Sequence, residues 1–275
     1  RVSELLGDAK VIHSEGRCFP VEIKYRGLLR LKNFEPKGPQ HFAGLVAKAV
    51  REGMREAPEG DVLVFLPGER EIMYTWIALN NSGVGDGVPP RNLIGWARKL
   101  IDTSVDLSES RVQVQTLYST LDTQEQDEVL RPPAAGWRKV ILATPIAESS
   151  LTVPGVRIVV DSGLRKVKVT EPETCMSYMN TIPVSRASAD QRSGRAGRVS
   201  SGLCYRLWDE AQQAGLAPSD QPEMMRADIA GVVLDLALAG RLSDEEIAAL
   251  PWVDAPPTEG LDHGRALLAR LRGIE

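Results

Sequence analysis

Short apolar runs alternate with helix-like segments from Asp61 onward, and this alternation constrains the fold more than any other feature of the chain. Buried parallel strands are typically apolar on both faces, and helices between them form repeated strand–helix–strand units. We predict strands at 61–67, 112–118, 139–144, 156–162 and 203–208, and helices at 69–79, 122–130, 145–151 and 185–198. An entering strand is predicted at 20–27. The sequence therefore predicts an α/β domain of three layers around a mostly parallel sheet.

Three segments depart from this alternation. The Gly- and Pro-rich run NSGVGDGVPPRN predicts a surface insertion over about 80–110, with a short helix at LIGWARKLI. LRKVKV and MSYMNTIPV flank the turn-like TEPET and predict a β-hairpin over about 163–184. The last segment, 213–275, predicts a small helical unit in which Ser243 and Glu246 form a capping box.

Composition limits the class of protein. The chain has 275 residues, 43% of them hydrophobic, and no apolar run approaches the roughly 20 residues that span a bilayer. Its start, RVSELLGDAK, lacks the apolar core of a signal peptide and an initiator Met, so we expect a piece of a longer soluble protein.

The cysteines and the net charge narrow the class further. Cys18, Cys175 and Cys204 are far apart and predict core residues in a reducing compartment, the cytoplasm or a eukaryotic organelle or nucleus, rather than a metal site. With a net charge of −4, any nucleic-acid binding requires a local basic surface.

The stretch ADQRSGRAGRVSSG is the strongest candidate for chemistry. In a helix, Gln191, Arg195 and Arg198 would share one stripe, and Arg192 would point about 100° away. Gly194 and Gly197 would each cost about 1 kcal/mol relative to Ala, which suggests a close approach to the backbone. Such a stripe suits phosphate binding, because guanidinium groups are permanent bidentate donors. The alternative is a solvated basic helix face.

At this point the residues resemble a known family. QRSGRAGR (191–198) is similar to motif VI of superfamily 2 helicases in its DEAH-box form. The resemblance extends to motif V in KVILATPIAESSLTVPGVRIVVDSGLRK, motif IV in VLVFLPGEREI, the block LYSTLDTQEQDEVL, the start of the second RecA-like domain in SEGRCFPVEIKY, and the winged-helix region in PEMMRADIAGVVLDLALAG with LPWVDAPP. Over nearly its whole length the chain resembles DEAH-box ATP-dependent helicases, especially the bacterial HrpB-like branch.

The resemblance implies a domain organisation. Residues 1–19 would be a linker from an absent first RecA-like domain, and 20–212 the second RecA-like domain, carrying the insertion and the hairpin. Residues 213–275 would be the truncated start of a winged-helix-like helical unit.

In this family, motif VI reaches the phosphates of ATP bound on the first RecA-like domain. The resemblance therefore assigns Arg195 and Arg198 as arginine fingers, with Gln191 near the γ-phosphate and Gly194 beside them. Fingers of this kind typically contribute about 10³ to 10⁵ in rate. Thr152 would lie near the ribose. Pro145 and Pro154 stand where the family often has Asn and Asp, so the ribose contact of that Asp is lost.

The resemblance also implies contacts with the backbone of single-stranded RNA or DNA. The implied residues are Gly68, Ser119, Thr120, Ala143, Thr144, Arg165, Lys166 and Lys168. The alternatives are a buried strand and its turn at 65–68, turn formation at 119–120, and an exposed strand face for the basic residues of the hairpin.

The sequence contains neither GxxxxGK[ST] nor a DEAH motif. We therefore expect the ATP and Mg²⁺ ligands of the first RecA-like domain to lie outside this chain, and the chain alone to be inactive as an ATPase. Two other hypotheses remain open: a non-catalytic nucleic-acid-binding scaffold that retains the fold, and a DNA translocase of the same superfamily.

Overall fold

The computed structural model describes residues 2–13, 19–31, 38–90, 95–149, 151–171, 176–241 and 243–273. The chain divides into two compact units, which are described separately. The larger unit comprises residues 17–166 and 181–220, and the smaller comprises 1–16, 167–180 and 221–275.

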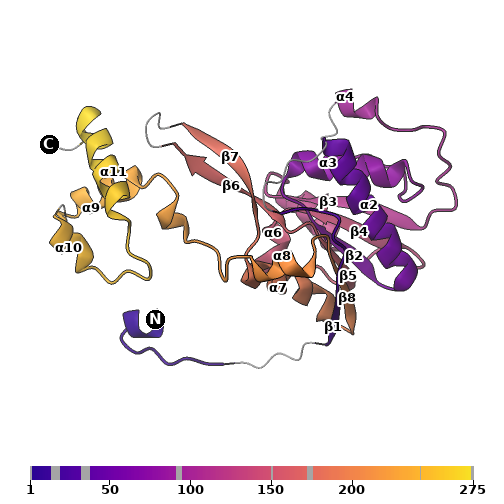
Figure 1. Cartoon of the computed structure of the whole chain (residues 1–275), viewed down its shortest axis with the longest axis horizontal. Coiled ribbons are helices and arrows are strands. Elements are labelled where there is room, and N and C mark those ends of the chain that lie inside the picture. The colour runs from indigo at the N-terminus through magenta and orange to yellow at the C-terminus, as the bar shows by residue number, and fades with distance from the viewer. Residues whose placement is uncertain are drawn as a thin grey trace. The chain divides into compact units, whose positions relative to one another are not determined.

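The larger unit is built on a six-stranded sheet in the order β1-β8-β5-β2-β4-β3, in which every neighbouring pair is parallel (Figure 1). The strands are β1 (Val21–Tyr25), β2 (Asp61–Phe65), β3 (Val112–Leu117), β4 (Arg138–Ala143), β5 (Val156–Asp161) and β8 (Gly202–Arg206). All six lie where the sequence predicts strands. The central strand β2 is buried at every position, as its continuous apolar run requires.

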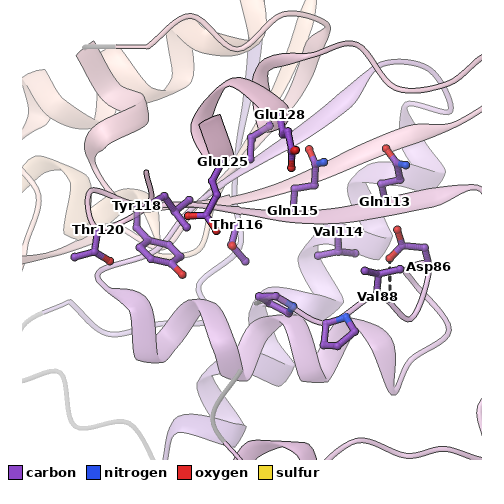
Figure 2. Close-up of a pocket in the computed structure, with 14 residues that line it drawn as sticks. Asp86, Val88, Gln113, Val114, Gln115, Thr116, Tyr118, Thr120, Glu125 and Glu128 are labelled. Atoms are coloured by element: carbon purple, nitrogen blue, oxygen red, sulfur yellow. Dashed lines mark hydrogen bonds between the residues drawn. The ribbon is translucent and has the colours of Figure 1, made fainter. Parts of the chain in front are cut away.

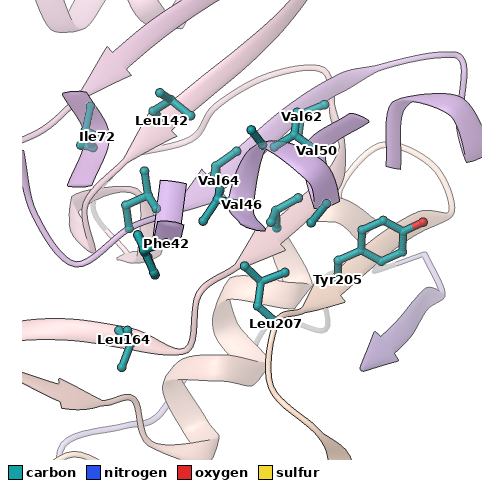
Figure 3. Close-up of a cluster of buried hydrophobic side chains, with 14 of the residues drawn as sticks. Phe42, Val46, Val50, Val62, Val64, Ile72, Leu142, Leu164, Tyr205 and Leu207 are labelled. Atoms are coloured by element: carbon teal, nitrogen blue, oxygen red, sulfur yellow. The ribbon is translucent and has the colours of Figure 1, made fainter. Parts of the chain in front are cut away.

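Helices cover both faces of this sheet and make the three predicted layers. On one face, α2 (Pro39–Glu56) and α3 (Glu69–Asn80) pack against alternate strand residues such as Val62 and Val64 (Figure 3). On the other face, α5 (Thr123–Leu130), α6 (Ile146–Ser149) and the turn after α7 (Arg186–Gly194) pack against residues such as Leu63 and Ile141. The predicted α/β architecture is therefore confirmed.

The longest helix of the described chain, α2, is not among the predicted elements. Its buried residues Phe42, Val46, Val50 and Gly53 recur at helical spacing. Gly53 allows a close approach, because a Cβ there would lie 3.1 Å from the side chain of Ile158. The insertion contains the short helix α4 (Gly95–Arg98), and part of the helix predicted around it, 93–94, lies outside the described residues.

The remaining elements are strands and small helices. Strands β6 (Leu164–Thr170) and β7 (Ser177–Pro183) form the predicted two-stranded hairpin. In the larger unit, α8 (Glu210–Ala214) follows β8. In the smaller unit lie α1 (Val2–Leu5), α9 (Ala230–Leu238), α10 (Asp244–Ala248) and α11 (Thr258–Arg270).

The structure confirms the predicted capping box and the predicted core position of one cysteine. Ser243 and Glu246 form the predicted capping box at the start of α10. Cys204 is fully buried in the core, and burial raises the pKa of its thiol, while Cys18 and Cys175 lie outside the described residues. None of the helices in the described ranges combines the length and apolar character that crossing a membrane requires.

Candidate functional site

The arginine-rich segment folds as a short helix followed by a tighter turn. Helix α7 begins after Ser185, whose hydroxyl accepts a hydrogen bond from the amide of Ser188 (3.1 Å), and ends at Gly194. A 3₁₀ turn over Arg195–Gly197 follows. The prediction of one helix through residue 198 is therefore wrong beyond Gly194, and the continuous α-helical stripe of Gln191, Arg195 and Arg198 is interrupted.

Arg192, Arg195 and Arg198 all contact the segment that connects β4 to β5, which contains helix α6. The contacts join Arg192 Nε to Glu148 Oε2 (3.0 Å), Arg195 Nη1 to the carbonyl oxygen of Leu151 (2.9 Å), and Arg198 Nη1 to Thr152 Oγ1 (2.8 Å). Successive arginines therefore contact successive residues of this connecting segment, so the stretches that resemble motifs V and VI are in direct contact.

Arg192 is fully buried and lies between two carboxylates. Its Nη1 is 2.9 Å from Asp161 Oδ1 and 3.3 Å from the carbonyl oxygen of Leu164, and its guanidinium lies 5.0 Å from the ring centre of Phe65. Burial by itself lowers the pKa of Arg192, but the charges of Asp161 and Glu148 outweigh burial and raise it. Arg192 therefore makes internal contacts only, unlike the exposed Arg198.

Arg195 and Arg198 differ from Arg192 in charge compensation. Arg195 is only 8% exposed and Arg198 is exposed, and within the described residues neither forms an ion pair with a carboxylate. Burial lowers the pKa of Arg195, and the neighbouring charge of Arg198 lowers it further. An anion beside these two groups would relieve both effects.

The two glycines of the segment have different roles. A Cβ on Gly197 would lie 2.5 Å from the carbonyl oxygen of Phe19, so this glycine is required by the chain's own segment before β1. The close approach to the backbone that was predicted at Gly197 is therefore made by the chain's own residue Phe19. A Cβ on Gly194 would meet nothing within 4 Å, and Gly194 is exposed. Gly194 thus leaves open space beside Arg195.

Five of the predicted nucleic-acid contacts lie where β2, β3 and β4 end: Gly68, Ser119, Thr120, Ala143 and Thr144. Because parallel strands end at the same edge, the residues after β2, β3 and β4 lie side by side there. Thr144 donates its amide hydrogen to Leu117 (3.0 Å), and Leu66 donates to Ala143 (2.8 Å). Ser119, Thr120 and Gly68 continue from the same strand ends, with Ser119 and Thr120 exposed.

Ala143 differs from the other residues at this edge. Its side chain is fully buried, and its carbonyl oxygen already accepts the bond from Leu66. A ligand therefore has no access to the Ala143 side chain.

Lys166 lies directly over Gly68. A Cβ on Gly68 would be 2.7 Å from Lys166 Nζ, so the missing side chain leaves room for this cation. Lys166 also forms a 2.7 Å ion pair with Glu71 in the first turn of α3. The structure brings these two predicted residues together, but it also places a carboxylate that a phosphate would have to displace.

The other two basic residues of the hairpin differ in their surroundings. Arg165 is paired with Asp220 at 2.7 Å. Lys168 is exposed on β6 and belongs to the smaller unit. Arg165 is therefore held within the larger unit.

Sequence reasoning missed Glu148 and Asp161, which are partners of Arg192. Asp161 carries one available signal, since it is a charged residue that ends the otherwise apolar run of β5. A buried charge at a strand end requires a partner. Nothing local identifies that partner as Arg192, which follows 31 residues later.

Comparisons with known proteins identify the family that this chain resembles. The family described as "Helicase conserved C-terminal domain" matches residues 93–200. The ATP-dependent RNA helicase HrpA of Escherichia coli K12 is 34% identical over 274 residues, covering 100% of this chain and 18% of HrpA. The ATP-dependent RNA helicase HrpB of the same organism is 34% identical over 275 residues, covering 100% of this chain and 29% of HrpB.

The structural comparison gives the same relative. The crystal structure of the Escherichia coli DEAH/RHA helicase HrpB matches with a TM-score of 0.79 and 32% identity, over 100% of this chain and 30% of that chain. The chain thus spans less than a third of the length of these relatives, and its core is the RecA-like helicase fold. Residues 93–200 therefore belong to the helicase conserved C-terminal domain family, and the chain as a whole is similar to the corresponding part of the HrpA and HrpB helicases.

Proposed function

We propose that this chain is the second motor domain of an ATP-dependent RNA helicase and supplies one wall of its ATP site. Arg195 and Arg198 would act as arginine fingers on the phosphates, Gln191 would lie near the γ-phosphate, and Thr152 would lie near the ribose. The residues that hold Mg²⁺ and cradle the phosphates would belong to the first RecA-like domain of the full-length protein.

One observation carries this proposal: Arg195 and Arg198 are adjacent cations without an ion-pair partner in the described chain, beside the open space at Gly194. Such a pair fits a polyphosphate, because each guanidinium can donate two parallel hydrogen bonds to phosphoryl oxygens. When ATP is bound, these charges would stabilise the negative charge that develops on the transferring phosphoryl group.

The same proposal assigns the adjacent sheet edge to the nucleic-acid backbone. The exposed hydroxyls of Ser119 and Thr120 and the groups around Thr144 and Lys166 would contact phosphates rather than bases. Single-stranded RNA is the preferred substrate class, because relatives that match the whole chain are named RNA helicases. The loop that contacts Arg195 and Arg198 follows directly from this edge, so nucleotide and RNA would bind to connected parts of one element.

The direct test is ATP hydrolysis by the full-length protein with and without single-stranded RNA or DNA of the same sequence. We expect RNA to stimulate hydrolysis more than DNA does. Equal or stronger stimulation by DNA would favour a DNA translocase. Nucleic-acid binding without any hydrolysis by the intact protein would favour the scaffold.

A further inference from the structure

Strand β3 leaves one edge of the sheet unpaired in the described structure. It is the last strand in the sheet order and pairs only with β4. The carbonyl oxygens of Arg111 and Leu117 accept hydrogen bonds from the amides of Arg138, the first residue of β4, and Thr144, the residue after β4. Because backbone groups alternate along a strand, Val112, Val114 and Thr116 direct their amides and carbonyls outward. Within the described ranges these outward groups have no backbone partner.

A cavity of about 490 Å³ runs along this edge. Its floor is the consecutive stretch Gln113–Thr116, one wall comes from α5, and the other comes from the loop that contains Val88 and the two prolines after it. Those prolines have no amide hydrogen to donate, so they do not satisfy the outward carbonyls of β3.

The two sides of the cavity differ in chemistry. Figure 2 shows Gln113 and Gln115 on the side of Glu125 and Glu128, and Val114 on the opposite side of the strand. Strand residues alternate between faces, so an added strand would also present alternate side chains to these two sides.

Charge complementarity identifies the kind of occupant. The described residues that line the cavity include the carboxylates Asp86, Glu125 and Glu128, and none of these described lining residues is a Lys, Arg or His. Gln115 Oε1 is buried without a hydrogen-bond partner in the described structure, so it is an acceptor available to an added donor. Burial raises the pKa of Asp86, and a nearby cation would offset the cost of its negative charge. An acidic lining of this kind disfavours nucleic acid and favours a basic group.

We propose that the free edge of β3 binds an extended basic segment of a partner protein, which joins the sheet as an additional strand. Its backbone pairs with Val112, Val114 and Thr116. Its basic side chains face Glu128 and the glutamines, and its alternate apolar side chains face Val88 and the prolines. Strand addition of this type obtains affinity from main-chain hydrogen bonds and specificity from alternate side chains.

The test measures binding of fluorescently labelled synthetic peptides of alternating Lys and Val to the full-length protein by fluorescence anisotropy. We expect the Lys–Val peptide to bind at least about tenfold more tightly than a matched Glu–Val peptide. Two further Lys–Val peptides carry N-methyl groups on alternate residues, one set in even positions and one in odd positions. Only the set whose amides face β3 should lose binding. Equal binding of the Lys and Glu peptides, or of the two methylated peptides, would overturn the proposal.

Protein variants locate the site. The combined change Glu128→Gln and Asp86→Asn should weaken Lys–Val peptide binding by about two- to fivefold. Asp127→Asn is the matched control, because Asp127 is an exposed acid adjacent in α5 that does not line the cavity. Equal effects of control and test variants would contradict the proposal. So would concentration-dependent self-association that the Lys–Val peptide cannot displace, since it would assign the edge to a second copy of the chain.

Discussion

Arg192 Nη1 lies 2.9 Å from Asp161 Oδ1, and both side chains are fully buried. The pair joins helix α7 to the end of β5. Glu148 of α6 adds a second carboxylate, which is 14% exposed. This ion-pair cluster therefore connects α7, directly before Arg195 and Arg198, to the segment between β4 and β5 that these two arginines contact.

Removal of one member of this cluster should be costly. We expect Arg192→Met to lower the free energy of unfolding by about 3–5 kcal/mol, because Asp161 would remain buried without its cation. The double change Arg192→Met with Asp161→Asn should cost less than the sum of the single changes. Urea unfolding followed by tryptophan fluorescence measures these differences, since Trp76 and Trp208 lie in the core of the same unit.

Arg165→Met serves as the control for this series. Its ion pair with Asp220 is partly exposed, so we expect a loss below about 1 kcal/mol. Similar losses for Arg192→Met and Arg165→Met would show that the buried cluster does not stabilise the fold as described.

The two glycines of motif VI provide a matched pair of variants. Gly197→Ala should lower the unfolding free energy by about 1–3 kcal/mol, because its Cβ would meet backbone at Phe19. Gly194→Ala should leave stability unchanged or raise it by up to about 1 kcal/mol, since it has open space and helical dihedral angles. If Gly194 borders the nucleotide, its variant should nevertheless raise the KM for ATP. A stable Gly197→Ala protein with an unchanged melting temperature would contradict the packing at Phe19.

Glu71 partly neutralises the charge of Lys166, so removal of the Glu71 carboxylate should strengthen RNA binding. We expect Glu71→Gln to increase the affinity for single-stranded RNA at low salt and to steepen the dependence of log K on log salt by ~0.7, the value for one added phosphate contact. Glu59→Gln is the control, because Glu59 pairs with Arg157 where β2 and β5 begin, whereas Lys166 and Gly68 lie near the strand ends. An unchanged salt slope in Glu71→Gln would remove Lys166 from the RNA site.

Asp61 should make stability depend on pH. Burial raises its pKa above the usual value, although the amide of Lys139 donates a hydrogen bond to it (2.7 Å). Because the pKa of Asp61 is higher in the folded protein than in the unfolded chain, protonation of Asp61 stabilises the fold. This stabilisation is fully present below the pKa of Asp in the unfolded chain, about 3.9, and is lost as the pH rises through the pKa of Asp61 in the folded protein. Asp61→Asn should therefore gain stability relative to the unsubstituted protein between about pH 4 and pH 7. A difference that stays constant or shrinks over this range would contradict the assignment.

The strands were predictable from sequence because runs such as DVLVF are buried on both faces and leave little ambiguity of type. Helix α2 was not predicted although its sequence carries a helical pattern, since Phe42, Val46, Val50 and Gly53 recur at helical spacing. The end of the α-helix at Gly194 was not predictable from local sequence. The turn that follows packs Gly197 against the backbone of Phe19, which is far away in the sequence.

The candidate site shows the same limit. Resemblance placed Arg195, Arg198 and Thr152 near one another, and the structure adds the contact between Arg198 and Thr152. The carboxylates around Arg192 and the acidic cavity beside β3 depend on long-range packing, which periodicity and spacing do not encode. The sequence does not show which cations are paired with a carboxylate. Lys166 forms an ion pair with Glu71, whereas Arg198 has no carboxylate partner in the described chain, and only the folded structure reveals this difference.

The proposed action of Arg198 on the phosphates of ATP is tested most directly by single-turnover ATP hydrolysis. The full-length protein is used with RNA bound, and Arg198→Ala is compared with Arg55→Ala. Arg55 is the control, because it is exposed in the last turn of α2, close to where the strands begin rather than where they end. Its position follows from Arg138 at the start of β4, which donates hydrogen bonds to the carbonyls of Met54 and Ala57. We predict that Arg198→Ala lowers the rate about 10³-fold or more with Arg55→Ala unchanged. A rate for Arg198→Ala within a few-fold of the unsubstituted protein would contradict the account.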